Sequence, residues 1–225
     1  PYAALFAAVA VALAAAPVAA QTPPSKEELA AYRDAHAAAA AGDVEAVRRF
    51  PPAELNARDR NGRTPLHVAA FRRQGAAAQA LIAAGADPAL LDNQRYDAVT
   101  IAAVADDVAT LQALLAAGAS AKLITSIYDG TALIAAAHLG HDGVVRQLIA
   151  AGAPLDHVNN LHWTALIEAV VLGDGKARHQ ATVAALLAAG ASTSLADRDG
   201  RTPLQLARSR GYTEIATLLE RAGAK

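Results

Sequence analysis

Residues 62–87 read GRTPLHVAAFRRQGAAAQALIAAGAD, and residues 200–224 read GRTPLQLARSRGYTEIATLLERAGA. Both stretches begin with Gly-Arg-Thr-Pro-Leu, continue with a short apolar run and carry Gly-Ala at or next to their end. Three more copies lie between them, and the first apolar anchor recurs at steps of 33, 34, 33 and 38 residues. The anchors are Leu66, Val99, Leu133, Leu166 and Leu204. Self-similarity at this period indicates an array of small structural units.

Each copy carries the local signals of two short helices. A threonine precedes the first helix, and its hydroxyl can accept a hydrogen bond from an otherwise unpaired amide, which stabilises the helix by about 1 kcal/mol. Asp97 replaces this threonine in the second copy and is an equally good N-cap. Pro65 and Pro203 stand at the first helical position, where a missing N–H costs nothing. The spacing of Leu and Ala gives each helix one apolar face, and a glycine closes the second helix.

The tetrapeptide Thr64-Pro65-Leu66-His67 within this period resembles the signature of the ankyrin repeat. The fifth copy keeps Thr-Pro-Leu-Gln, the third and fourth keep Thr-Ala-Leu-Ile, and the second departs most, with Asp-Ala-Val-Thr. The resemblance covers about residues 35–224 and implies an all-α ankyrin-repeat solenoid of stacked helix-turn-helix units joined by β-hairpin-like loops. It also implies that His67 hydrogen-bonds the backbone of the neighbouring loop. The five predicted repeats span approximately residues 59–91, 92–124, 125–157, 158–195 and 196–225.

The chain before residue 59 divides into three predicted parts. Residues 1–20 contain an uncharged run and end in small residues at the −3 and −1 positions, which is typical of a cleaved signal peptide. We therefore expect a periplasmic or secreted protein, cut near Ala20-Gln21. Residues 21–26 form a linker, and residues 27–58 a capping helical pair. Its first helix is expected to begin at a capping box starting at Ser25 and to run to about Ala41, and the second to span Val44 to Phe50.

Composition excludes several classes of function. The net charge is −1, with 20 basic and 21 acidic residues and no basic stripe, so we expect no nucleic-acid partner. There is no cysteine, which excludes disulfides, thiolate catalysis and cysteine-based metal sites. The apolar run near the start is shorter than the roughly 20 residues of a membrane span, so we expect no membrane insertion after the signal is removed.

Motifs for catalysis or cofactor binding are missing from the sequence. There is no His-Glu-x-x-His, Gly-x-Ser-x-Gly or Gly-x-Gly-x-x-Gly pattern, and Gly-Asp-Gly-Lys at 173–176 lacks the rest of a phosphate loop. The alternative to a binding protein is a metal-dependent or enzymatic site on the loop of the fourth repeat. Its ligands would be Asp156, His157, His162 and His179.

The resemblance implies binding through a concave face made of hairpin tips and first helices. We expect a non-catalytic protein-protein interaction module without a cofactor, monomeric, similar to small exported ankyrin proteins of Gram-negative bacteria. The fourth copy has five extra residues, which we place in the bend between its helices. An exposed apolar patch is expected from Phe71, Ile101, Val104, Val171 and Leu172. The predicted partner-binding residues are Phe71, Arg72, Arg95, Tyr96, Tyr128, Asp129, His138, His162, Trp163, Glu168, Leu172, Lys176, Arg178 and His179.

Overall fold

The structure, a computed structural model, describes residues 21–225, so the predicted signal segment lies outside the described residues. The described part of the chain holds fourteen helices. They are α1 Lys26–Ala31, α2 Ala35–Ala41, α3 Val44–Val47, α4 Pro52–Leu55, α5 Pro65–Phe71, α6 Gly75–Ala83, α7 Ala98–Val104, α8 Val108–Ala116, α9 Ala132–Leu139, α10 Asp142–Ala150, α11 Ala165–Val171, α12 Ala177–Ala188, α13 Pro203–Ser209 and α14 Thr213–Arg221. None of these is long and apolar enough to cross a membrane.

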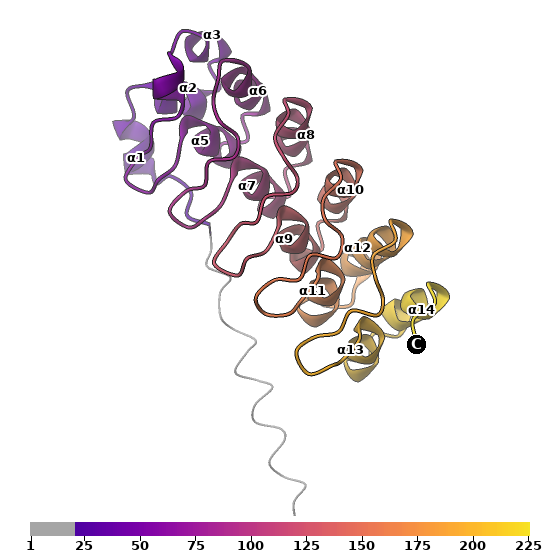
Figure 1. Ribbon diagram of the computed structural model, residues 1–225. Helices are drawn as coiled ribbons and strands as arrows, with labels where there is room; N and C mark the ends of the chain where they lie inside the picture. The colour runs from indigo at the N-terminus through magenta and orange to yellow at the C-terminus, as the bar shows by residue number, and fades with distance from the viewer. Residues whose placement is uncertain (1–20) are drawn as a thin grey trace, which may run out of the picture.

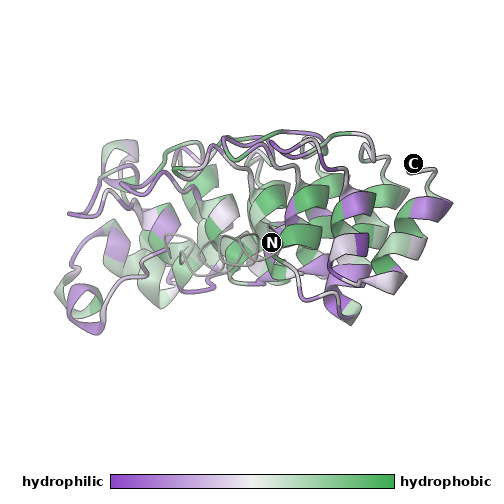
Figure 2. Ribbon diagram, turned by 90° about the horizontal axis from the view of Figure 1, so that it is seen from below, coloured by the Kyte–Doolittle hydropathy of each residue, from purple (hydrophilic) through white to green (hydrophobic). Residues whose placement is uncertain are grey.

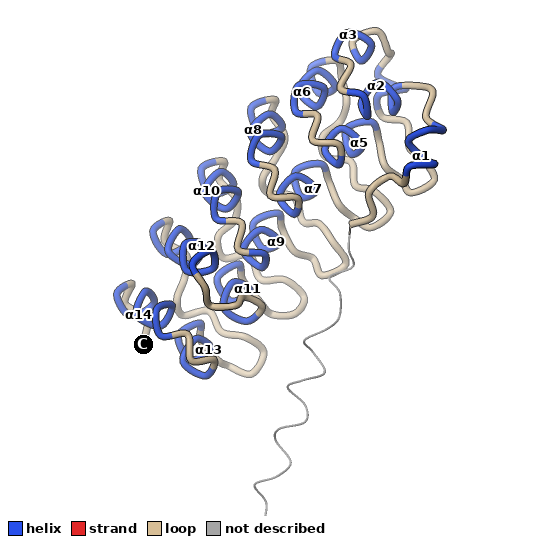
Figure 3. The backbone as a smooth tube through the Cα atoms, turned by 180° about the vertical axis from the view of Figure 1, so that it is seen from behind, coloured by secondary structure: helices blue, strands red, loops and turns tan. Residues whose placement is uncertain are grey.

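The helices stand in two parallel rows (Figure 1). The inner row contains α5, α7, α9, α11 and α13, and the outer row contains α6, α8, α10, α12 and α14. Each predicted repeat range holds one inner and one outer helix. Long loops connect each outer helix to the next inner helix, and Figure 3 shows no strand in the described residues. The one extended pairing recorded there is an isolated antiparallel bridge between Thr125 and Gly130. The predicted all-α solenoid of stacked helix pairs is thus confirmed.

The core is a seam of aliphatic side chains that runs the length of the array. Figure 2 places most hydrophobic residues on the helices. One leucine of every outer helix, at the same place in each copy, is fully buried. These leucines are Leu81, Leu114, Leu148, Leu186 and Leu219, each 0% exposed. Full burial of a leucine contributes about 2 kcal/mol. Alanines fill much of the space between neighbouring helices, so the helices pack closely, and Tyr96 is the one aromatic residue in the buried core of the described residues.

The predicted helix caps are present. Thr131, Thr164 and Thr202 accept hydrogen bonds from the amide three residues later, and Asp97 accepts one from the amide of Thr100. Thr64 forms a capping box with His67, whose Nε2 lies 2.9 Å from the carbonyl oxygen of Tyr96 in the next hairpin. That contact is the role that the resemblance implied for His67.

The N-terminal region differs from the predicted helical pair. Ser25 does cap α1, but the chain turns extended at Tyr32, and Asp34 caps a separate helix, α2. The helix that begins at Val44 ends at Val47, which leaves Phe50 half-buried outside it. α4 was not predicted.

The helix pair α2–α3 stacks on α5–α6 as the five repeats stack on one another. Nε2 of His36 lies 3.0 Å from the carbonyl oxygen of Arg63, which directly precedes the N-cap Thr64. His67 contacts the carbonyl of Tyr96, which directly precedes the N-cap Asp97, in the same manner. The N-terminal pair therefore contacts its neighbour as a further repeat does.

The prediction that the five extra residues of the fourth copy lie in the bend is only partly right. α12 has 12 residues where α10 and α14 have 9, so three of the five extend the helix. The other two lengthen the bend, where Gly175 has a φ of +70°.

The hairpin tips contain left-handed residues at equivalent positions in all five copies. Glycine occupies this position in the first and fifth copies, as Gly62 and Gly200. Arg95, Asp129 and His162 occupy it in the middle three, with φ of +64°, +53° and +64°. In the third copy Asp129, and not the adjacent Gly130, thus takes the left-handed conformation.

Candidate functional site

The inner row of helices ends in a stripe of exposed and half-exposed side chains. The residue that follows or ends each inner helix is Arg72, Ala105, Leu139, Leu172 or Arg210, and we call these five the inner stripe. Leu139 and Leu172 are each 38% exposed; the other exposed large aliphatic side chains among the described residues, Val108, Ile124, Ile127 and Val158, lie outside the inner helices. The stripe is apolar in its middle and ends in an arginine on each side.

Three residues expected on the exposed face are buried instead. Tyr96 is 3% exposed, Glu168 is 5% exposed and Ile101 is 0% exposed. Ile101 and Glu168 lie four residues after an N-cap, at a position the stack of inner helices encloses. Tyr96 directly precedes an N-cap and packs into the same core. Phe71, Val104 and Val171 are half-buried, so the predicted apolar patch is narrower and centres on Leu139 and Leu172.

A chain of three polar residues links the third and fourth repeats beneath the inner stripe. Nδ2 of Asn159 donates to Oε1 of Glu168 at 3.1 Å. Oε2 of Glu168 lies 3.3 Å from Nδ1 of His138, but it makes no hydrogen bond of good geometry. The Glu168 side chain is 6% exposed and that of His138 is 22% exposed. We call Asn159, Glu168 and His138 the polar chain.

The equivalent positions in the other repeats show that the polar chain is specific to this place. The position of Glu168 is taken by Val68, Ile101, Ala135 and Leu206 in the other copies. A buried carboxylate costs free energy unless it is fully paired, so packing of the fold does not explain Glu168.

Asn159 has a second role, which it shares with residues at the same position elsewhere. Its Oδ1 accepts from the amides of Leu161 and Trp163 at 3.0 Å each, closing the hairpin. Asp59 and Asp197 accept the equivalent pairs of amides in the first and fifth copies. An amide in place of a carboxylate supplies the N–H that reaches Glu168 and avoids placing two negative charges together.

The bend of the fourth repeat is tightly built around His179. Nδ1 of His179 lies 2.9 Å from Oδ1 of Asp174, and Nε2 lies 2.9 Å from the carbonyl oxygen of His138. The hydroxyl of Tyr212 donates to the carbonyl of Gly173 at 2.9 Å. His179 therefore holds the bend against α9 and has little surface left for a partner.

The two basic residues of this bend remain accessible. Nη2 of Arg178 pairs with Oδ2 of Asp106 at 2.6 Å, and Nζ of Lys176 lies 3.7 Å from Oδ2 of Asp174. Both basic side chains are more than half exposed, at 56% for Arg178 and 82% for Lys176.

The four residues of the metal-dependent alternative are not brought together. Asp156 accepts from the amide of Ser192 at 2.8 Å, and Nε2 of His157 lies 2.6 Å from the carbonyl oxygen of Asp129. His162 is at an exposed hairpin tip, while His179 is held in the bend. Within residues 21–225 no group of three or more histidine, aspartate or glutamate side chains is placed to hold a metal ion.

At the hairpin tips, Trp163 and Tyr128 are half-buried, and Trp163 packs against the hydrophobic core. Arg95 and Asp129 pair at 3.0 Å, with both side chains 48% exposed. His162 is exposed.

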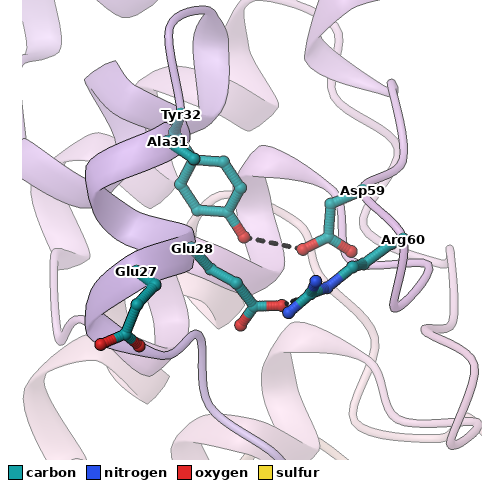
Figure 4. Close-up of a pocket in the computed structure, with 6 residues that line it drawn as sticks. All are labelled: Glu27, Glu28, Ala31, Tyr32, Asp59 and Arg60. Atoms are coloured by element: carbon teal, nitrogen blue, oxygen red, sulfur yellow. Dashed lines mark hydrogen bonds and ion pairs between the residues drawn. The ribbon is translucent and has the colours of Figure 1, made fainter.

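A buried ion cluster in the N-terminal repeats was not predicted from the sequence. Arg63 is 1% exposed and binds Asp59 at 2.7 Å and Glu28 at 2.9 Å. The hydroxyl of Tyr32 donates to Asp59 at 2.7 Å. Beside the cluster lies an open pocket of about 430 Å³. Figure 4 shows the residues that line it: Glu27, Glu28, Ala31, Tyr32, Asp59 and Arg60.

Hydrogen bonding in this cluster lowers the pKa of the Asp59 carboxyl group. Burial alone would raise the pKa of Asp59, but the bonds from Tyr32 and Arg63 outweigh it and hold that pKa below its usual range. The pKa of Tyr32 is raised by burial and by its bond to Asp59. The cluster fixes α1 to the first hairpin. The Asp-x-x-x-Arg pairs at 59–63 and 197–201 were the sequence signal for it.

Helix pairs that repeat in register, stacked along one axis with their loops on one side, define a solenoid protein. The family description "Ankyrin repeats (3 copies)" matches residues 35–124 and 99–197, and "Ankyrin repeat" matches residues 199–225. The chain belongs to the ankyrin repeat family. Domains of this family are typically protein-binding modules.

Known proteins resemble the chain over most of its length. The ankyrin repeat protein YahD of Escherichia coli (strain K12) is 39% identical over 190 residues, covering 83% of this chain and 94% of YahD. The crystal structure of an ankyrin repeat domain (ABAYE2397) from Acinetobacter baumannii AYE has a TM-score of 0.78 and 47% identity, covering 85% and 98% of the two chains. The ankyrin repeat domain of Bcl-3, a member of the IkappaB family, has a TM-score of 0.77 at 28% identity, covering 87% and 88%.

Proposed function

We propose that the protein binds another protein along its inner face, with Leu139 and Leu172 at the centre of the contact and without catalysing a reaction. The observation that carries this proposal is the exposure of these two leucines at adjacent, equivalent places in the array. Large aliphatic side chains grouped on a surface favour burial against a partner. Arg72 and Arg210, exposed at the ends of the inner stripe, add charge at its rim.

The test is capture of the partner from an extract of the native host with Leu139→Asp and Leu172→Asp combined. Both side chains are partly exposed, so the variant keeps its fold, and a melting curve checks this. Captured proteins seen with the parent chain should be lost with the variant. The matched control is Gln112→Asp, a similar change at an exposed position on the outer row, which should leave capture intact. Retained capture by the double variant would place the contact elsewhere.

A second part of the proposal is export. It is supported by the uncharged stretch Ala3–Ala16 and by the small residues Val18 and Ala20 ahead of Gln21. Expression of the complete gene in the native host, followed by fractionation and N-terminal sequencing, tests it. A mature chain that starts at Gln21 outside the cytoplasm is the expected result, and an uncleaved chain in the cytoplasm would contradict it. The mature protein is expected to be a monomer.

A further inference from the structure

The polar chain contains a buried carboxylate, that of Glu168, which has few partners in the described part of the chain. Among residues 21–225, His138 is the only basic side chain within ion-pair distance of Glu168. One oxygen of Glu168 is buried and lacks a hydrogen bond. A buried polar atom without a partner is rare in native proteins and calls for an explanation.

His138 connects this buried charge to the surface. Nδ1 faces Oε2 of Glu168 at 3.3 Å, so Nε2 is the ring nitrogen that is turned away from the carboxylate. No hydrogen bond to Nε2 is recorded within the described residues, and the side chain is 22% exposed. The imidazole therefore offers a ring nitrogen at the surface beside the inner stripe, with a carboxylate directly behind it.

The surroundings of His138 favour a long side chain with an apolar stem. Leu139 follows it in sequence, and Leu172 holds the position equivalent to Leu139 in the next repeat, each 38% exposed. Arginine and lysine lay their methylene groups on such a surface while their charged ends reach a polar group. An anionic group would be repelled by Glu168, and a neutral donor would not gain from its charge.

We propose that this place, between α9 and α11, receives an arginine or lysine side chain of the partner protein. The cationic end donates to Nε2 of His138, Glu168 supplies the opposite charge, and the stem packs on Leu139 and Leu172. Asn159 acts as a positioning residue, because it holds the carboxylate through Oε1 at 3.1 Å. This inference rests on the proposed function and adds the chemistry of the partner's central contact.

The direct test uses small probes and the full chain. Nuclear magnetic resonance signals of the His138 ring are followed at pH 8 while Nα-acetyl-arginine amide is added. Nα-acetyl-citrulline amide, which has the same shape and no charge, is the control probe. The arginine probe should shift the His138 signals in a saturable way and bind roughly tenfold more tightly than the citrulline probe, which corresponds to about 1.4 kcal/mol.

Variants make the result specific to Glu168. Glu168→Gln keeps the shape and an oxygen for Asn159, and it should remove the preference for the charged probe. Glu214→Gln removes a glutamate charge at an exposed position on α14 and should leave the preference unchanged. Equal binding of the two probes to the parent chain would overturn the inference, as would a preference that survives Glu168→Gln.

Partner capture separates this inference from the proposed function. Loss of capture with Leu139→Asp/Leu172→Asp together with full capture by Glu168→Gln would keep the inner stripe as the binding surface and overturn the cationic contact. Full capture by all variants would overturn the proposed function itself. The expected result is that the Glu168→Gln variant retains at least tenfold less of the partner protein than the parent chain does.

Discussion

Nη1 of Arg95 lies 3.0 Å from Oδ1 of Asp129, and this pair joins the tips of two successive hairpins at residues that both have left-handed backbones. The left-handed conformation costs a non-glycine residue about 1–2 kcal/mol. An ion pair that is half exposed returns only about 0.2–1 kcal/mol. The ion pair therefore does not offset the cost of the left-handed backbone at these two residues.

Arg95→Gly is expected to stabilise the protein. Glycine removes the cost of the left-handed conformation, which raises the free energy of unfolding by about 1–2 kcal/mol. Loss of the ion pair lowers it by up to about 1 kcal/mol, and the more flexible unfolded chain lowers it by about 0.4–1 kcal/mol. At mid-range these contributions leave a small net gain of about 0.2 kcal/mol, measured as a shift of the urea unfolding midpoint. Arg95→Gln keeps the strained backbone and loses the pair, so it should be less stable than the parent chain. That deficit should disappear at 1 M salt, and a deficit that persists there would contradict the account.

Asp97→Asn is expected to raise stability at neutral pH. Burial raises the pKa of Asp97 in the folded chain above its ordinary value near 3.9. The folded state then binds a proton that the unfolded state has released, so stability falls as pH rises from about 4 through the raised pKa. Asparagine caps helices equally well and does not titrate. Melting temperatures from pH 3 to pH 8 should show the variant gaining on the parent as pH rises; a constant difference would be the contrary result.

The local signals in the sequence were sufficient to predict the solenoid and its caps. N-cap threonines, N1 prolines and apolar spacing act within one or two helical turns, so they can be recognised in the sequence alone. The end of the first helix before Tyr32 could not be predicted from the sequence, because it depends on Asp59 and Arg63 about thirty residues away. The accessible face was misjudged at Ile101 and Glu168 for a similar reason. The neighbouring inner helices bury these two side chains. Exposed side chains of the inner row are found at the helix ends, as at Leu172.

The polar chain should behave as an energetically coupled unit. His138→Ala alone leaves the buried carboxylate of Glu168 with one fewer partner and is expected to cost about 1–3 kcal/mol. Glu168→Gln removes the buried charge and should be neutral or stabilising. In the Glu168→Gln background the histidine has no charge to face, so its loss should cost much less. A double-mutant cycle in chemical unfolding should give a coupling of about 1 kcal/mol, and strictly additive effects would show that the two residues do not interact.

The bend of the fourth repeat should be the most sensitive glycine site in the chain. A β-carbon on Gly173 would lie 2.1 Å from the carbonyl oxygen of Ala169 and 2.6 Å from the ring of His179. Gly173→Ala must therefore displace backbone, at a cost of about 2–3 kcal/mol, which lowers the melting temperature by roughly 5–10 °C.

Gly143 provides the matched control for this substitution. Its β-carbon would meet a methyl group of Val108 at 3.5 Å, an ordinary contact, and it lies within α10. Gly143→Ala should stabilise that helix by up to about 1 kcal/mol, because alanine is the better helix former. Equal melting temperatures for the two variants would mean that the bend yields to the added methyl group. His179 and Tyr212 would then not hold the segment in the packed form from which His138 receives its backbone contact.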